Sequence, residues 1–204
     1  MKRMKERPEL VAVIGDLVNS RGSNRLTAHN TLKAALAALP SDAVMALAPT
    51  VGDEIQGVFA TAGAAIRSTH LLRLTMLAHN CDIRFGLGLG DVVEIGDGIQ
   101  DGSAWWHARE GLNSVEELAQ TPGWAGVRTG FPDAEPTVLA SAQLIDAHIS
   151  ALRPGTCETL LGLLTDEPNQ DTATRLGISP SANTQRVKSN NLRPLAQAMQ
   201  ALWS

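Results

Sequence analysis

Two segments of the sequence place acidic residues where an apolar strand is predicted to end. In VAVIGDLVNSR (residues 11–21) Asp16 follows an apolar run, and in APTVGDEIQGVF (residues 48–59) Asp53 and Glu54 lie at a turn. Two carboxylates about 4 Å apart repel each other by roughly 4 kcal/mol at an effective dielectric constant near 20. A divalent cation between them removes this repulsion, and Mg²⁺ commonly accompanies bound phosphates. We therefore predict that Asp16 and Asp53 hold Mg²⁺ or Mn²⁺, with Glu54 as an alternative ligand.

A purely structural role fits the same residues. Aspartate side chains accept hydrogen bonds from backbone N–H groups in turns, and Glu54 can equally be a solvated strand residue. The residues alone leave both interpretations open.

Hydrophobic patterning predicts the elements that would bring these carboxylates together. Strands are predicted at residues 9–15, 43–50, 54–60 and 82–95, with one helix ending at Pro40 and a second at 61–79. This order is that of the ferredoxin-like fold, an antiparallel sheet with two helices on one face. In that fold the end of the first strand lies beside the turn between the second and third. Asp16 and Asp53 are therefore expected to meet.

Three glycines recur at period two on the fourth predicted strand, at Gly86, Gly88 and Gly90. Strand positions without side chains on one face indicate that something packs very close to that face. Either a ligand or helices packed on the sheet would satisfy this pattern.

Composition limits the classes of partner. The chain has 204 residues, 44% of them apolar, and a net charge of −4, so no global field favours nucleic acid or an anionic membrane. Cys81 and Cys157 make no disulfide framework. No apolar region follows the basic start, and no run approaches the roughly 20 residues of a membrane span. We expect a cytoplasmic protein without membrane contact.

The second half of the chain is predicted to be mainly helical. A helix is expected in DGSAWWHAREGLNSVEELAQ, then a loop or short strand at 124–131, and then a helix capped by Asp133. Pro154-Gly155 marks a predicted boundary between a domain at 8–153 and a small all-α domain at 156–204.

The predicted small domain has the pattern of a helix-turn-helix. Helices are expected at 157–164, from Pro168 to Leu176, and from the Ser179-Pro180 cap onward, with LGIS as the turn. The last helix of this motif is expected to carry Arg186, Lys188 and Arg193 and no acidic residue, which suits a phosphate backbone. The predicted DNA contacts are Ser181, Gln185, Arg186 and Lys188. Dimerisation through a degenerate motif is the alternative.

Four motifs carry a family resemblance: VIGDLVNSR, VGDEIQGVF, IRFGLGLGDVV and DGSAWWHARE. Their order resembles the SatD family, and more distantly the class III nucleotidyl cyclases and the diguanylate cyclases, whose GGDEF motif is similar to VGDEI. The resemblance implies a ferredoxin-like, cyclase-like domain in which Asp16 and Asp53 are metal ligands. The residues predicted to contact nucleotide or phosphate are Leu17 (through its carbonyl), Arg21, Arg25, Gly52, Trp106 and Arg109.

One departure from the cyclase pattern bears on catalysis. The cyclase helix motif carries an Asn and an Arg that orient ribose and phosphate. Here Gly102 and Ala108 fit the motif, but Trp106 stands in place of the Asn and Arg109 lies one position early. The loss of the Asn argues against cyclase turnover but not against nucleotide or metal binding.

These observations predict a regulatory protein, expected to be a homodimer. Its cyclase-like domain would bind a Mg²⁺–nucleotide, and its tail would bind DNA or a protein partner. The alternatives are a nucleotidyl cyclase-type phosphoryl-transfer enzyme and a vestigial, non-catalytic scaffold.

Overall fold

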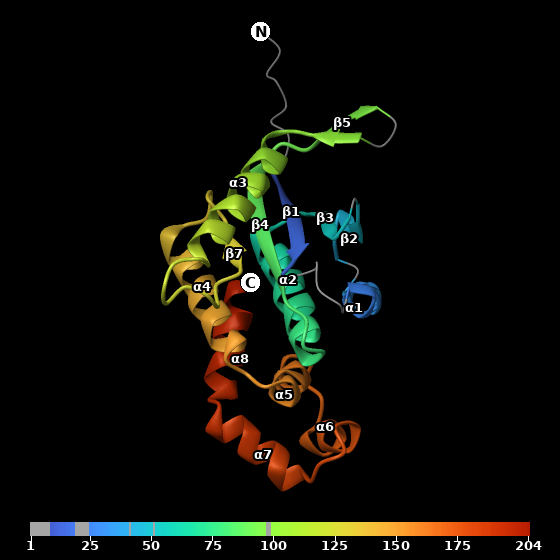
Figure 1. Ribbon diagram of the computed structural model, residues 1–204, viewed down its shortest axis with the longest axis vertical. Coiled ribbons are helices and arrows are strands. Elements are labelled where there is room, and N and C mark those ends of the chain that lie inside the picture. Colours follow the sequence, from blue (N-terminus) through green and yellow to red (C-terminus); the bar gives the residue numbers. More distant parts are fainter. Residues whose placement is uncertain (1–8, 19–24, 41, 51, 97–98) are drawn as a thin grey trace.

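The computed structural model describes residues 9–18, 25–40, 42–50, 52–96 and 99–204. Its architecture is α+β, with a five-stranded mixed sheet covered by helices on both faces and further helices at one end (Figure 1). Arg21 lies outside the described residues, as does the side chain of Arg25.

The central sheet has the strand order β2-β3-β1-β4-β7. Its members are β1 (Leu10–Leu17), β2 (Met45–Pro49), β3 (Glu54–Phe59), β4 (Ile83–Gly90) and β7 (Thr129–Gly130). The first four are antiparallel to their neighbours, as predicted, whereas β7 pairs with β4 in parallel. The prediction of a wholly antiparallel sheet is therefore wrong at this edge.

The central strand β1 divides the core by the alternation of its side chains. Val11 and Val13 belong to the core on one face, and Ala12 and Ile14 belong to the core on the other. By the same alternation, Asp16 lies on the face of the sheet that carries Ala12 and Ile14. It is paired with Glu54 of β3 on one side and with Arg84 of β4 on the other.

Helices cover both faces of the sheet. Helices α1 (Arg25–Ala37) and α2 (Ala62–Ala78) contribute to the first core, and α3 (Ser103–Leu118) packs on the opposite face. The prediction of helices on one face is therefore incomplete. A Cβ at Gly86 or Gly88 would collide with the backbone of α3, so these glycines admit the helix, and no bound ligand is needed to explain them.

The predicted strand 82–95 is broken at its far end. Gly90 has φ +153°, and the chain leaves the central sheet there to form a separate hairpin of β5 (Val93–Gly96) and β6 (Ile99–Asp101). Figure 1 shows this hairpin projecting from the end of the molecule that carries the start of α3.

The remaining helices are α4 (Pro136–Ser150), α5 (Pro154–Leu164), α6 (Asn169–Arg175), α7 (Pro180–Ser189) and α8 (Leu192–Leu202). Glu135, and not Asp133, is the N-cap of α4; the Asp133 carboxylate instead accepts the Leu89 N–H. A second core joins α2 and α4 to α5, α7 and α8, so residues on both sides of Pro154 share it. The predicted domain boundary stays a prediction. Within the described ranges, no helix combines the length and apolar character that a bilayer crossing requires.

Candidate functional site

The predicted metal ligand Asp16 lies at the end of β1 and binds an arginine. Its Oδ2 accepts hydrogen bonds from Nε and Nη2 of Arg84, at 3.2 and 2.9 Å. Burial raises the pKa of Asp16, Arg84 lowers it, and the nearby charge of Asp53 raises it again. Asp16 pairs with Glu54, so the turn that carries Asp53 lies beside the end of β1, as the strand order predicts.

A second arginine compensates Glu54. Arg109 of α3 contacts the Glu54 carboxylate at 2.7 Å, and the Gln56 amide donates to its other oxygen at 2.9 Å. Arg84 also contacts Glu116 of α3 at 3.0 Å. Carboxylates and guanidinium groups therefore alternate along the α3 face of the sheet, and α3 is tied to β3 and β4 by ion pairs. We call this set the edge cluster: Asp16, Asp53, Glu54, Arg84, Arg109 and Glu116.

The turn between β2 and β3 carries the second predicted ligand. Thr50 N–H donates to the Glu54 carbonyl at 2.9 Å and closes the turn, in which Gly52 has φ +73°. Among the described residues, the Asp53 carboxylate and the Asp16 Oδ1 make no hydrogen bond. Leu17 buries its side chain, so only its backbone could serve a ligand. Among the described residues, three carboxylate oxygens, two of Asp53 and one of Asp16, thus remain for a cation.

This set is small for a metal site. In the part of the chain that the structure describes, no group of three or more His, Cys, Asp or Glu side chains gathers to hold a metal. Mg²⁺ in nucleotide sites is commonly bound by one or two carboxylates, with phosphates and waters as its other ligands. The donor set fits a metal that arrives with a nucleotide better than one held by protein alone.

Trp106 lies away from these carboxylates. Helix α3 begins beside Gly90, which pairs with Leu10 at the start of β1, whereas Asp16 lies near the end of β1. Six strand residues span about 20 Å. Trp106 is 65% exposed, and its Nε1 donates to Asp101 at 3.1 Å. The structure thus does not bring Trp106 to the predicted nucleotide contacts, but it does bring Arg109 to Glu54.

Behind the edge cluster lies a charged cluster that the sequence patterns did not indicate. Arg73 of α2 is 1% exposed and contacts Asp82 at 2.9 Å and Asp146 at 2.6 Å. Arg128 binds the same Asp82 at 2.7 Å. The Asp82 carbonyl accepts the Val18 N–H at 3.0 Å, which anchors the end of β1. We call Arg73, Asp82, Arg128 and Asp146 the buried cluster.

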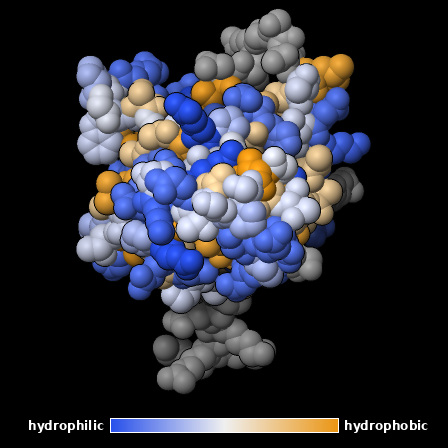
Figure 2. All heavy atoms as spheres, turned by 90° about the horizontal axis from the view of Figure 1, so that it is seen from below, coloured by the Kyte–Doolittle hydropathy of each residue, from blue (hydrophilic) through white to orange (hydrophobic). Residues whose placement is uncertain are grey.

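In the tail, α6 and α7 are joined by the four residues 176–179. Ser179 caps α7 and accepts the Ala182 N–H at 3.1 Å, as predicted. The predicted DNA contacts Ser181, Gln185 and Lys188 are exposed on α7. Arg186 differs from them, because it is half-buried and donates to the Gly155 carbonyl at 3.0 Å. Figure 2 shows that this end of the molecule is largely hydrophilic.

The tail is held together partly by buried polar side chains. The Thr159 hydroxyl donates to Asn183 at 2.7 Å, and the Asn183 amide donates to Asn169 at 3.0 Å. Thr172 donates to Glu167 at 2.9 Å. These bonds connect α5, α6 and α7 at positions where helix-turn-helix motifs usually bury aliphatic residues.

The fold and the edge cluster define an α+β protein with a mixed sheet, in which acidic side chains from β1 and the β2–β3 turn converge. The chain belongs to the SatD family, whose family model matches residues 10–201. The match includes the C-terminal helices and extends well beyond the four motifs. Comparison with curated proteins gave no match.

Proposed function

We propose that this SatD-family protein is a regulator that binds a Mg²⁺–nucleotide at the edge cluster and binds DNA, or a protein partner, through α6 and α7. The observation that carries the nucleotide-binding part is the pairing of Asp16 with Glu54, which brings the β2–β3 turn with Asp53 to the end of β1. Asp16 and Asp53 come from different parts of the chain, and each keeps a carboxylate oxygen without a hydrogen bond among the described residues.

The strand order supports a nucleotide as the ligand of the edge cluster. The β2-β3-β1-β4 part of the sheet, antiparallel throughout, follows the order of a ferredoxin-like domain. The cyclases that the motifs resemble carry their metal aspartates at the corresponding strand end and turn. Asp16 and Asp53 would hold the cation here, with the Leu17 carbonyl as a further ligand. Bound Mg²⁺ would neutralise phosphate charge, and among the described residues Arg84 and Arg109 are guanidinium groups paired with the carboxylates of the edge cluster.

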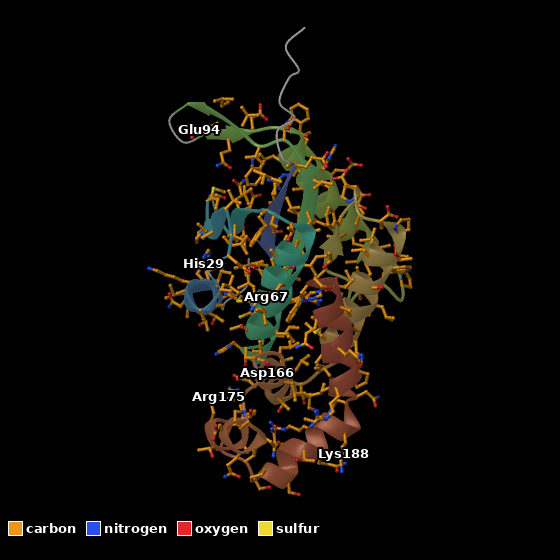
Figure 3. The ribbon with its side chains drawn as sticks, turned by 180° about the vertical axis from the view of Figure 1, so that it is seen from behind. His29, Arg67, Glu94, Asp166, Arg175 and Lys188 are labelled. Atoms are coloured by element: carbon orange, nitrogen blue, oxygen red, sulfur yellow. The ribbon has the colours of Figure 1, made fainter. Side chains whose placement is uncertain are left out.

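Thermal denaturation tests the nucleotide half. We expect at least one nucleoside triphosphate or cyclic dinucleotide to raise the melting temperature in the presence of Mg²⁺ and not in EDTA. Asp16→Ala and Asp53→Ala should abolish the shift. Glu94→Ala is the matched control, because Glu94 is an exposed carboxylate on the projecting hairpin, far from the edge cluster (Figure 3). The absence of a shift for every nucleotide in wild type would contradict the proposal.

The ion pairs of the edge cluster favour a second candidate function, a scaffold without a ligand. Arg84 and Arg109 already compensate Asp16 and Glu54, so the carboxylates do not require a metal to coexist. On this account Mg²⁺ and nucleotides leave the melting temperature unchanged, and Arg84→Ala loosens α3 from the sheet.

The enzyme alternative predicts that ATP or GTP with Mn²⁺ releases pyrophosphate, and that Asp53→Ala stops the release.

A further inference from the structure

Helix α7 is flanked on both sides by pairs of cationic side chains. It lies at the extreme end of the molecule, on the side remote from the β5–β6 hairpin (Figure 1). Asn183 and Val187 bury one side of α7 against the other tail helices, and Ser181 and Gln185 are exposed on the other. At 100° per residue, Arg186 lies to one side of Gln185 and Lys188 to the other.

The first pair is Arg153 and Arg186. They line a shallow cavity of about 590 Å³ between α7 and the start of α5, together with Ser189 and Asn190. The bond from Arg186 to the Gly155 carbonyl holds its guanidinium against Gly155, where a Cβ would come within 3.0 Å of Arg186 Nη1. Of the described residues that line this cavity, none is acidic. Arg153 is exposed and belongs to no sequence motif.

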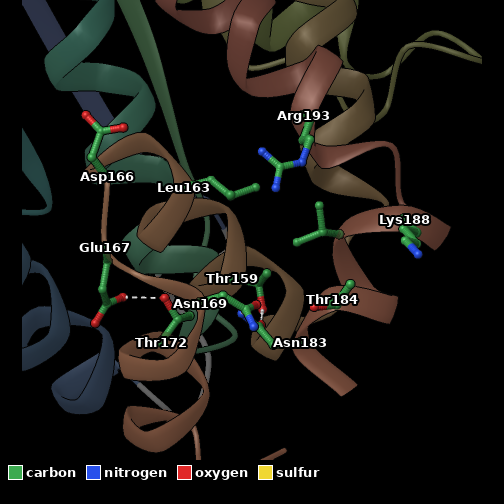
Figure 4. A pocket seen from close by; sticks show the side chains of 11 residues that line it. Thr159, Leu163, Asp166, Glu167, Asn169, Thr172, Asn183, Thr184, Lys188 and Arg193 are labelled. Atoms are coloured by element: carbon green, nitrogen blue, oxygen red, sulfur yellow. Dashed lines mark hydrogen bonds between the residues drawn. The ribbon is translucent and has the colours of Figure 1, made fainter. Parts of the chain in front are cut away.

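The second pair is Lys188 and Arg193. They line a cleft of about 440 Å³ on the opposite side of α7, between α7, α8 and α5. Asp166 and Glu167 lie across this cleft, on the turn between α5 and α6 (Figure 4). Glu167 is already compensated by Arg175 at 2.8 Å and by Thr172. The basic side of the cleft is therefore the side that adjoins α7.

The charge of the last two helices differs in sign from that of the whole chain. From Pro180 to Ser204 the sequence contains Arg186, Lys188 and Arg193 and no acidic residue, although the chain carries a net charge of −4. An α-helix with its side chains is about 10–12 Å wide, close to the roughly 12 Å width of the DNA major groove. Cations on both sides of such a helix are placed to reach the two phosphate backbones that border the groove.

We infer that α7 enters the major groove of double-stranded DNA, with Arg153 and Arg186 contacting one phosphate backbone and Lys188 and Arg193 the other. Ser181 and Gln185 then face the base edges. This inference rests on the DNA half of the proposed function and chooses duplex DNA over a protein partner. It adds Arg153, from outside the helix-turn-helix pattern, and it places Arg193 on α8 and not on the recognition helix.

Salt dependence of binding to a mixed-sequence 30-base-pair duplex tests the inference, with no nucleotide present. Each phosphate-contacting cation contributes about 0.9 to the slope of log K against log salt concentration. Arg153→Ala/Arg186→Ala should lower the slope by about 1.8, and Lys188→Ala/Arg193→Ala by the same amount. Lys33→Ala is the matched control, because it removes an exposed cation on α1, and its slope should equal that of wild type.

Arg186→Ala also removes a bond to α5, so the single variants of exposed residues, Arg153→Ala and Arg193→Ala, are decisive, and each should lower the slope by about 0.9. A slope that responds to one pair only, or equally tight binding of single-stranded DNA, would overturn the inference and leave DNA binding by the tail in place. A duplex that does not bind even at low salt would overturn the inference together with the DNA half of the proposed function. The nucleotide half is measured separately and is unaffected by either result.

Discussion

The edge cluster and the buried cluster lie at the same end of β1, yet they differ in how completely their charges are paired. In the buried cluster, Arg73 and Asp146 are each 1% exposed, and Arg73 also donates to the Gly126 carbonyl and the Ser150 hydroxyl. In the edge cluster, Asp16 and Glu54 are only partly buried, and Asp53 has no partner among the described residues. Full pairing indicates a structural role, and incomplete pairing leaves oxygens for a ligand.

The largest effect is expected in the buried cluster. Arg73→Ala leaves the buried Asp146 carboxylate without its cation, and breaking a buried ion pair in this way costs about 3–5 kcal/mol. Urea denaturation would measure this loss. Arg67→Ala, six residues earlier on α2, is the control: Arg67 forms an exposed pair with Asp42, so about 1 kcal/mol or less is expected. Equal losses in the two variants would remove the distinction between the clusters.

A histidine beside the buried cluster should make the fold sensitive to acid. Burial lowers the pKa of His70 from 6.5 to about 4, opposed by Asp146 and supported by Arg73. Its neutral ring accepts the Trp203 Nε1–H at 3.1 Å. The folded-state pKa is depressed, so the His70 contribution to the free energy of unfolding is fully present above pH 6.5. This contribution falls by about 3 kcal/mol as the pH drops toward 4.

Unfolding free energies measured from pH 7 to pH 4 test this expectation. His70→Gln should show a weaker loss over that range than wild type. An identical loss in the variant would assign the acid sensitivity to other groups.

The two clusters also differ in how far the sequence predicts them. The strand order follows from local apolar patterning, and with it the meeting of Asp16 and the Gly52–Asp53 turn was predictable. The contact between Asp16 and Arg84 was predictable too, since the two residues occupy facing positions once the two strands are aligned. The buried cluster joins Arg73 to Asp146, 73 positions apart, and no local pattern encodes such a contact.

Other differences between the sequence prediction and the structure each have a particular cause. The two-residue strand β7 forms only because Phe85 and Gly86 of β4 offer it an edge. The break after β4 depends on the backbone angle of Gly90, which strand propensity does not reveal. The family motif assigns Trp106 to the nucleotide contacts, but α3 starts at the other end of the sheet.

A moderate effect is expected from removing the guanidinium that shares Asp16. Arg84→Gln leaves the aspartate pair uncompensated and should lower stability by about 1 kcal/mol in EDTA. Mg²⁺ alone should then raise the melting temperature of Arg84→Gln more than that of wild type, because the cation replaces the missing charge. Equal Mg²⁺ shifts in the two proteins would indicate that no cation enters the edge cluster in the absence of a nucleotide.

The smallest effect concerns the titration of Asp16. Its pKa is raised, chiefly by burial, so its contribution to stability is present below the unfolded value of 3.8 and is lost as the pH rises through the folded value. In EDTA, the free energy of unfolding of Asp16→Asn minus that of wild type should therefore increase between pH 4 and pH 7. A difference that stays constant or decreases over this range would contradict the raised pKa.

Direct counting of bound Mn²⁺ by electron paramagnetic resonance tests the central claim, that Asp16 and Asp53 share a cation. In the presence of a nucleotide that stabilises the protein, wild type and Glu94→Ala should bind Mn²⁺ beyond what the nucleotide holds in free solution. Asp16→Ala and Asp53→Ala should lose this binding. Mn²⁺ binding by Asp53→Ala equal to that of wild type would show that the two aspartates do not form a metal site.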